Sequence, residues 1–118
     1  MRRAIIMVAV ALIFGLSGCT KYTIPTPPCP DGDTTAKYAA DIQPIFNSNC
    51  ISCHPAIAPP DLSDGWSYDE LISGGYVDTD FPCESILYQK FFGSHDGRAT
   101  DDEVLQILGW IQDGAQDN

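Results

Sequence analysis

Cations, histidines and methionines are scarce in this chain of 118 residues. Six Lys and Arg stand against sixteen Asp and Glu, which gives a formal net charge of −10. A chain with this balance is repelled by the phosphates of nucleic acid, so a nucleic-acid-binding function is excluded. No segment alternates apolar and polar residues as a half-buried strand does. We therefore expect an all-α protein whose partners do not include nucleic acid.

The longest apolar run is too short to cross a bilayer comfortably. It covers residues 4–16, follows two arginines, and has the length and flanks of an export signal. The run ends in Leu16-Ser17-Gly18-Cys19, which resembles the lipobox of bacterial lipoproteins, whose signal peptide is cut before the cysteine. The resemblance implies a signal peptide over residues 1–18 and an acylated Cys19. A conventional secretory signal with an incidental cysteine is the alternative.

Proline is concentrated directly after this signal. Residues 19–35 contain four prolines and have the composition of a semi-rigid polyproline spacer. A lipid on Cys19 would anchor the chain to a membrane through this tether without a membrane-spanning helix. We therefore expect a lipid-anchored protein of the bacterial cell envelope, periplasmic or outer-membrane-associated, with one domain over residues 36–118.

Two of the five cysteines form the most specific motif of the chain. Cys50-Ile51-Ser52-Cys53-His54 has the C-x-x-C-H spacing of c-type haem attachment, in which two thiols bond the haem vinyl groups and the imidazole ligates the iron. We expect one covalent haem c on Cys50, Cys53 and His54. Together with Cys83 and His95, the same residues could instead ligate zinc, and a plain disulfide within the motif is a further alternative.

Short amphipathic segments separated by Gly- and Pro-rich loops follow residue 38. Asp41 is a candidate N-cap for a helix that runs toward the haem motif. Ser67 and Thr100 each begin a capping-box spacing, three residues before a glutamate. The helices are expected at about 41–50, 67–73, 84–92 and 100–113.

Several short segments surround the haem motif in a fixed order. They are Asp41-Ile42-Gln43-Pro44-Ile45-Phe46, Asp61-Leu62-Ser63, Gly74-Gly75, Ser85-Ile86-Leu87-Tyr88 and Thr100-Asp101-Asp102-Glu103. In this order they resemble the small class I cytochrome c-like domains of exported bacterial proteins, related to the planctomycete-type cytochrome c domain and common among Bacteroidetes lipoproteins. The resemblance implies a loop-rich cytochrome c-like fold of short helices around one haem. An iron with six ligands has no position open to a substrate, so we expect an electron carrier, not an enzyme, that exchanges single electrons with exported redox proteins.

Methionine is missing from the expected mature chain, because Met1 and Met7 belong to the signal peptide. The resembled domains usually supply a methionine before the last helix as the second axial ligand, whereas here that loop reads Gly93-Ser94-His95-Asp96-Gly97. We expect His95 to be this ligand, opposite His54. The alternative is a solvated His95 beside Asp96, with an iron that is five-coordinate or is capped by water or a lysine. A vacant position would suit a peroxidase-like haem enzyme or a ligand sensor.

The imidazole of His54 needs a partner for the nitrogen that does not face iron. In the resembled domains a loop folds back under this ring at the position of Pro59 and Pro60. We expect one of their carbonyls to accept the Nδ1 proton.

Two cysteines remain after Cys19, Cys50 and Cys53 are assigned. They are Cys29 and Cys83, and an oxidising compartment favours a disulfide between them. The bond would tie the end of the tether to the loop before the third helix. The alternative is that the spacer keeps Cys29 too far away.

Overall fold

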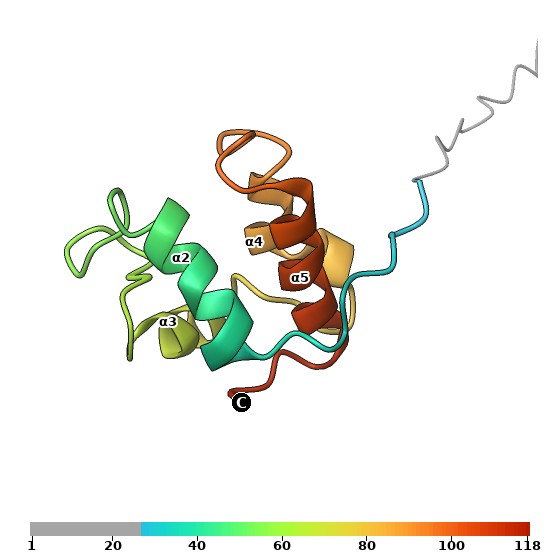
Figure 1. Cartoon of the computed structure of the whole chain (residues 1–118), viewed down its shortest axis with the longest axis horizontal. Helices are drawn as coiled ribbons and strands as arrows, with labels where there is room; N and C mark the ends of the chain where they lie inside the picture. Colours follow the sequence, from blue (N-terminus) through green and yellow to red (C-terminus); the bar gives the residue numbers. More distant parts are fainter. Residues whose placement is uncertain (1–26) are drawn as a thin grey trace, which may run out of the picture.

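The computed structural model describes residues 27–118, and every regular element among them is helical (Figure 1). The elements are the π-helical turn η1 (Tyr38–Ile42), α2 (Gln43–Asn49), α3 (Ser67–Ser73), the 3-10 turn η2 (Pro82–Glu84), α4 (Ile86–Lys90) and α5 (Asp101–Gln112). The predicted all-α class is therefore confirmed for this part of the chain. The expected signal peptide, Cys19 and the tether as far as residue 26 lie outside the described residues. No helix within residues 27–118 is long and apolar enough to cross a membrane.

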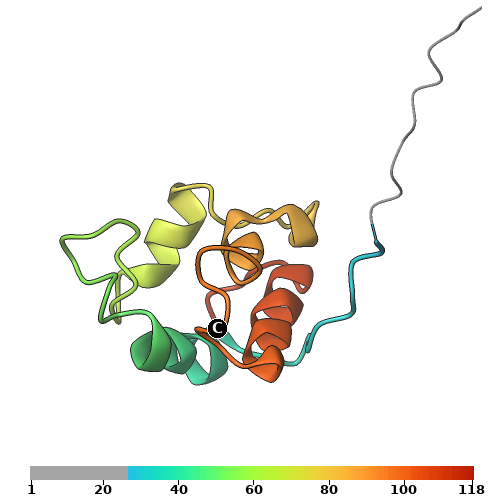
Figure 2. The ribbon, with the colours of Figure 1, turned by 90° about the horizontal axis from the view of Figure 1, so that it is seen from above.

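The helices form two groups on opposite sides of the domain. Both views place α2 and α3 on one side and α4 and α5 on the other (Figures 1 and 2). The loop between α2 and α3, which carries the C-x-x-C-H motif, extends outward from the first group. The N-terminal segment of residues 27–35 runs along the side of α5.

An aromatic cluster joins the two groups. Tyr38 of η1 packs on Trp110 of α5, with ring centroids 5.0 Å apart, and on Tyr68 of α3 at 5.1 Å. Burying an aromatic side chain contributes about 1.5–3 kcal/mol, so this cluster carries much of the stability of so small a core. The other buried side chains of α5 are Val104, Ile107, Leu108 and Ile111.

The last helix begins as predicted. Thr100 is the N-cap of α5, and its hydroxyl accepts the backbone N–H of Glu103 while the Glu103 carboxylate accepts the N–H of Thr100 at 2.8 Å. This reciprocal pair is the capping box expected from the sequence.

The first helix begins earlier than predicted. Asp41 is not its N-cap, because helical structure starts at Tyr38 and the Asp41 carboxylate accepts the backbone N–H of Lys37 at 2.8 Å. The carboxylate thus satisfies a free N–H at the helix start from inside the helix. The sequence thus predicted a helix at the right place, but the helix begins at Tyr38, three residues before Asp41.

Ser67 is not the N-cap of α3 either. Trp66 occupies that position, and the buried Ser67 hydroxyl instead donates to the side chain of Gln43 and bonds the Tyr38 hydroxyl at 2.6 Å. The Gln43 amide in turn donates to the Leu62 carbonyl at 3.1 Å. Burial raises the pKa of Tyr38 to about 12, so its hydroxyl stays neutral in this network. The capping box was a wrong prediction because tertiary hydrogen bonds use the hydroxyl.

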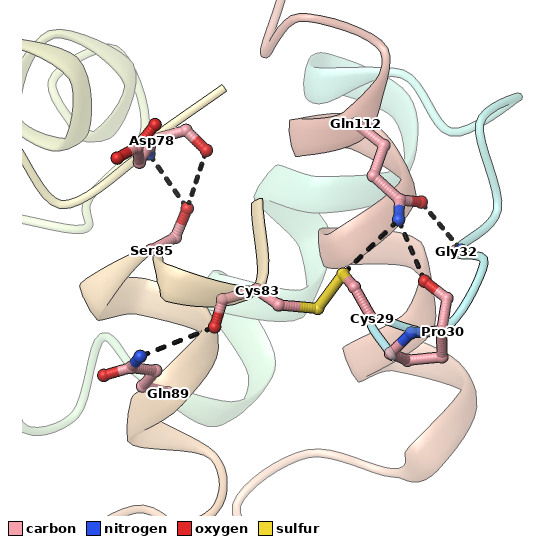
Figure 3. The surroundings of a disulfide bond; sticks show 8 residues. All are labelled: Cys29, Pro30, Gly32, Asp78, Cys83, Ser85, Gln89 and Gln112. Carbon is pink, nitrogen blue, oxygen red and sulfur yellow. Dashed lines mark hydrogen bonds between the residues drawn. A yellow bond between two sulfur atoms is a disulfide. The ribbon is translucent and has the colours of Figure 1, made fainter. Parts of the chain in front are cut away.

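The third predicted helix is broken in two. Ser85 separates η2 from α4 with an extended backbone, ψ 130°. Its hydroxyl accepts the N–H of Asp78 at 2.9 Å and lies 3.2 Å from the carbonyl of the same residue (Figure 3). This buried side-chain bridge holds Ser85 out of the helix, and α4 is correspondingly shorter than the span predicted from its apolar residues.

A disulfide joins Cys29 to Cys83, the pair expected from the sequence, with their Cα atoms 5.8 Å apart (Figure 3). Gln112, at the end of α5, donates to the Pro30 carbonyl at 2.9 Å and accepts the N–H of Gly32 at 2.8 Å. These bonds fix the end of the predicted tether to the domain.

Two glycines allow this N-terminal segment to cross α5 closely. A Cβ added at Gly109 would lie 2.1 Å from the backbone carbonyl of Asp33, and one added at Gly32 would lie 2.2 Å from the backbone nitrogen of Gly109. The N–H of Asp33 donates to the Leu105 carbonyl at 3.0 Å at the same crossing. The atoms in contact belong to the backbone on both sides, so an added methyl group could not be accommodated by rotating a side chain.

We predict that Gly109→Ala lowers the free energy of unfolding by about 2 kcal/mol, because overpacking against rigid backbone exceeds the helix-propensity gain of alanine. Urea denaturation measures the change. The matched control is Gly93→Ala, whose added methyl meets nothing within 4 Å and whose φ is not positive. An equal effect of the two substitutions would show that the crossing is not tight.

We predict that Cys29→Ser together with Cys83→Ser lowers the free energy of unfolding by about 4 kcal/mol, because the bond closes a loop between cysteines 54 positions apart. Chemical reduction of the unsubstituted protein should produce the same loss. Thiol labelling of the unfolded, unreduced protein should find neither cysteine free. Labelled thiols at both positions would contradict the pairing.

Candidate functional site

An apolar cleft opens between the two helical groups. Its volume is about 570 Å³ with its opening to solvent included. Its walls come from α2, α3, α4 and the loops that follow each of these helices. The apolar wall includes Phe46, Pro60, Leu62, Leu71, Leu87 and Phe91. A cleft with this lining suits an apolar ligand with few polar groups.

The chain's two histidines meet in this cleft. His54 follows the motif cysteines after α2, and His95 lies in the loop between α4 and α5, yet their ring centroids are 5.9 Å apart and their planes differ by 30°. Two imidazoles on opposite sides of one metal ion, each bonded at about 2.0–2.1 Å, have ring centres roughly 6 Å apart. The separation therefore leaves room for one metal ion between the rings.

The loop around His95 leaves one of its nitrogens free. Ser94 Oγ lies 2.8 Å from Nδ1 of His95, and in the tautomer in which Nδ1–H donates to this oxygen, Nε2 has the lone pair that a metal needs. Partial burial lowers the pKa of His95, and the nearby His54, Lys90 and Arg98 lower it further by smaller amounts. A lowered pKa keeps the imidazole neutral, which is the form that binds metals.

His54 is positioned by the turn that continues from α2. Its backbone N–H and that of Cys53 both donate to the Cys50 carbonyl at 3.0 Å, and its own carbonyl accepts the N–H of Leu62 at 3.1 Å. Its Nδ1 is buried and has no hydrogen-bond partner among the described residues. The expected bond to Pro59 or Pro60 is therefore wrong for this structure, in which Pro60 contributes to the cleft wall.

The two motif cysteines have different surroundings. Both are free thiols, so the plain disulfide considered for the motif is not formed. Cys50 lines the cleft, and burial raises the pKa of its thiol, as does nearby Glu103, while Arg98 opposes them. Cys53 is exposed on the solvent side of the same turn and is not part of the cleft lining.

The residues considered for a zinc site do not come together in residues 27–118. Cys83 is bonded to Cys29, and no three His, Cys, Asp or Glu side chains of the described residues cluster to hold a metal ion. The two facing imidazoles are a two-ligand arrangement, whereas a structural zinc site has four.

Two cations at the cleft were missed by sequence analysis. Lys90, at the end of α4, and Arg98, in the loop before α5, both belong to its lining. No local motif marks them. The sequence could have indicated them only because cations are rare in this chain and two of the six lie within five residues of His95.

The fit of a haem to this site can be judged from the chain's own groups. The cleft has apolar walls, two imidazoles with ring centroids 5.9 Å apart, a thiol in the lining with a second one nearby, and a buried imidazole nitrogen without a partner. A porphyrin needs apolar contact on its faces and axial donors at its centre, so these residues fit the group. Comparisons with models of protein families, with curated proteins and with solved structures find no match.

Proposed function

We propose that the protein is a monohaem c-type cytochrome that carries single electrons between exported redox partners. Cys50 and Cys53 would hold the haem covalently, and His54 and His95 would be its two axial ligands. The observation that carries the proposal is the pairing of the chain's two imidazoles, 5.9 Å apart, across an apolar cleft beside the C-x-x-C-H turn.

Haem supplies reversible one-electron chemistry at its iron, and the chain determines the potential and access. The apolar wall would shield a bound haem from water and lower the local dielectric, which would strengthen the influence of nearby charges on its iron. Ser94 orients His95 by holding Nδ1. With both axial positions filled by imidazoles, no position is open to a substrate, so the arrangement favours a carrier over an enzyme.

We propose further that the carrier belongs to the bacterial cell envelope. The lipobox-like Leu16-Ser17-Gly18-Cys19 supports acylation of Cys19 and membrane anchoring through it. A disulfide between Cys29 and Cys83 suits an oxidising compartment outside the cytoplasm. The cytochrome c-like fold that the segments around the motif imply is part of the same proposal.

This function is tested by asking whether the protein binds haem covalently. The protein produced together with a cytochrome c maturation system should keep its haem through acid extraction and denaturing electrophoresis, because thioether bonds survive both. Cys50→Ala with Cys53→Ala should release the haem under the same treatment. A colourless protein from cells that mature a known cytochrome c would refute the proposal.

We predict that His95 sets the spin state and potential of the iron. His95→Ala should give a high-spin iron that binds carbon monoxide. His95→Met should restore six-coordination, introduce the weak sulfur-to-iron charge-transfer band, and raise the midpoint potential within the roughly 0.8 V range that axial ligands span. Visible and near-infrared spectra and a potentiometric titration measure these changes.

The control for this prediction is Asp96→Asn, which changes the neighbouring loop residue and should leave the low-spin spectrum intact. If His95→Ala also kept the low-spin spectrum and potential, His95 would be a loop residue only. A high-spin, ligand-binding iron in the unsubstituted protein would favour the five-coordinate enzyme or sensor instead.

A further inference from the structure

The distribution of positive charge in the domain is uneven. Residues 27–118 contain three cations, Lys37, Lys90 and Arg98, and all sixteen acids of the chain. Two of the three cations line the cleft, while no Asp or Glu of the described residues does. Sixteen acids surround only three cations in these residues, so a cation at a random surface position would be expected to have an acidic neighbour.

The backbone holds both cations next to His95. The N–H of His95 donates to the Lys90 carbonyl at 3.0 Å, and the N–H of Arg98 donates to the His95 carbonyl at 3.1 Å. Both side chains are exposed although they contribute to the lining. A lysine or arginine that is exposed and yet lines an apolar cleft contacts it through its apolar stem and keeps its charged end in solvent.

Neither cation has a counter-charge in the structure. Among the described residues, no carboxylate lies within ion-pair distance of the Lys90 ammonium or the Arg98 guanidinium. Two unpaired cations on one rim repel each other, and a bound anion would remove this repulsion. The positive charges of Lys90 and Arg98 therefore complement a ligand that places an apolar part in the cleft and an anionic group beside these two residues.

We propose that Lys90 and Arg98 bind the two propionate carboxylates of the haem. This inference rests on the proposed function, and it assigns a role to residues outside the C-x-x-C-H motif and the axial pair. A haem is an apolar disc with two carboxylates on one edge, which corresponds to an apolar cleft with two cations at its opening. Arginine can hold a carboxylate through two parallel N–H bonds, and lysine holds one as a point charge.

The first experiment uses the covalent holoprotein. Resonance Raman spectra report the propionate bending modes, which depend on the hydrogen bonds that the carboxylates accept. Lys90→Gln with Arg98→Gln should shift these modes, and each single substitution should give part of the shift. The matched control is Lys37→Gln, which removes one positive charge from an exposed position outside the cleft lining and should leave the modes unchanged.

The second experiment compares haem with its dimethyl ester, in which both carboxylates are blocked. The variant Cys50→Ala with Cys53→Ala binds either compound without covalent bonds, and spectrophotometric titration gives both dissociation constants. We expect haem to bind about tenfold more tightly than the ester, because charge-assisted bonds at an exposed rim are partly screened. Adding Lys90→Gln and Arg98→Gln should abolish this preference.

The outcomes separate the two proposals. Covalent haem with propionate modes unaffected by the double substitution would overturn the propionate site and leave the cytochrome proposal standing. An unchanged preference for haem over its ester would do the same. A wild-type protein that acquires no haem at all would overturn the function and this site together.

Discussion

The packing of Tyr38 on Trp110 is the contact on which the rest of the structure depends. Tyr38 begins the helical segment that leads through α2 to the motif cysteines, and Trp110 lies on the helix that follows the His95 loop. The elements that precede His54 and follow His95 thus meet at this aromatic contact. Bonds from Tyr38 to Ser67, and from Ser67 to Gln43, tie α3 to the same point.

The cleft and the hydrophobic core share residues. Phe46, Leu62, Leu71 and Phe91 are buried core residues, and they also line the cleft. A domain of this size buries little apolar surface, so its stability is sensitive to whether such walls face a ligand or water. Filling the cleft with an apolar group would extend the core across both helical groups. Ligand binding and folding stability are then linked by mass action.

Sequence reasoning succeeded where the signal is local and failed where tertiary contacts decide. The α5 capping box depends on residues three apart, and it is present as predicted. Ser67 carries the same local pattern, but its hydroxyl is used by a partner 24 positions away, and Ser85 breaks a helix through a bond to Asp78. The pairing of His54 with His95 was expected only by resemblance and elimination, and no spacing rule could have given their separation. Lys90 and Arg98 were missed because the rim that makes them neighbours exists only in three dimensions.

The disulfide between Cys29 and Cys83 determines where the chain enters the domain. It holds the N-terminal segment beside η2 and the end of α5, whereas the loop with the C-x-x-C-H turn projects from the other end of the molecule (Figures 1 and 2). A protein attached to a bilayer through this segment would direct that loop away from the lipid.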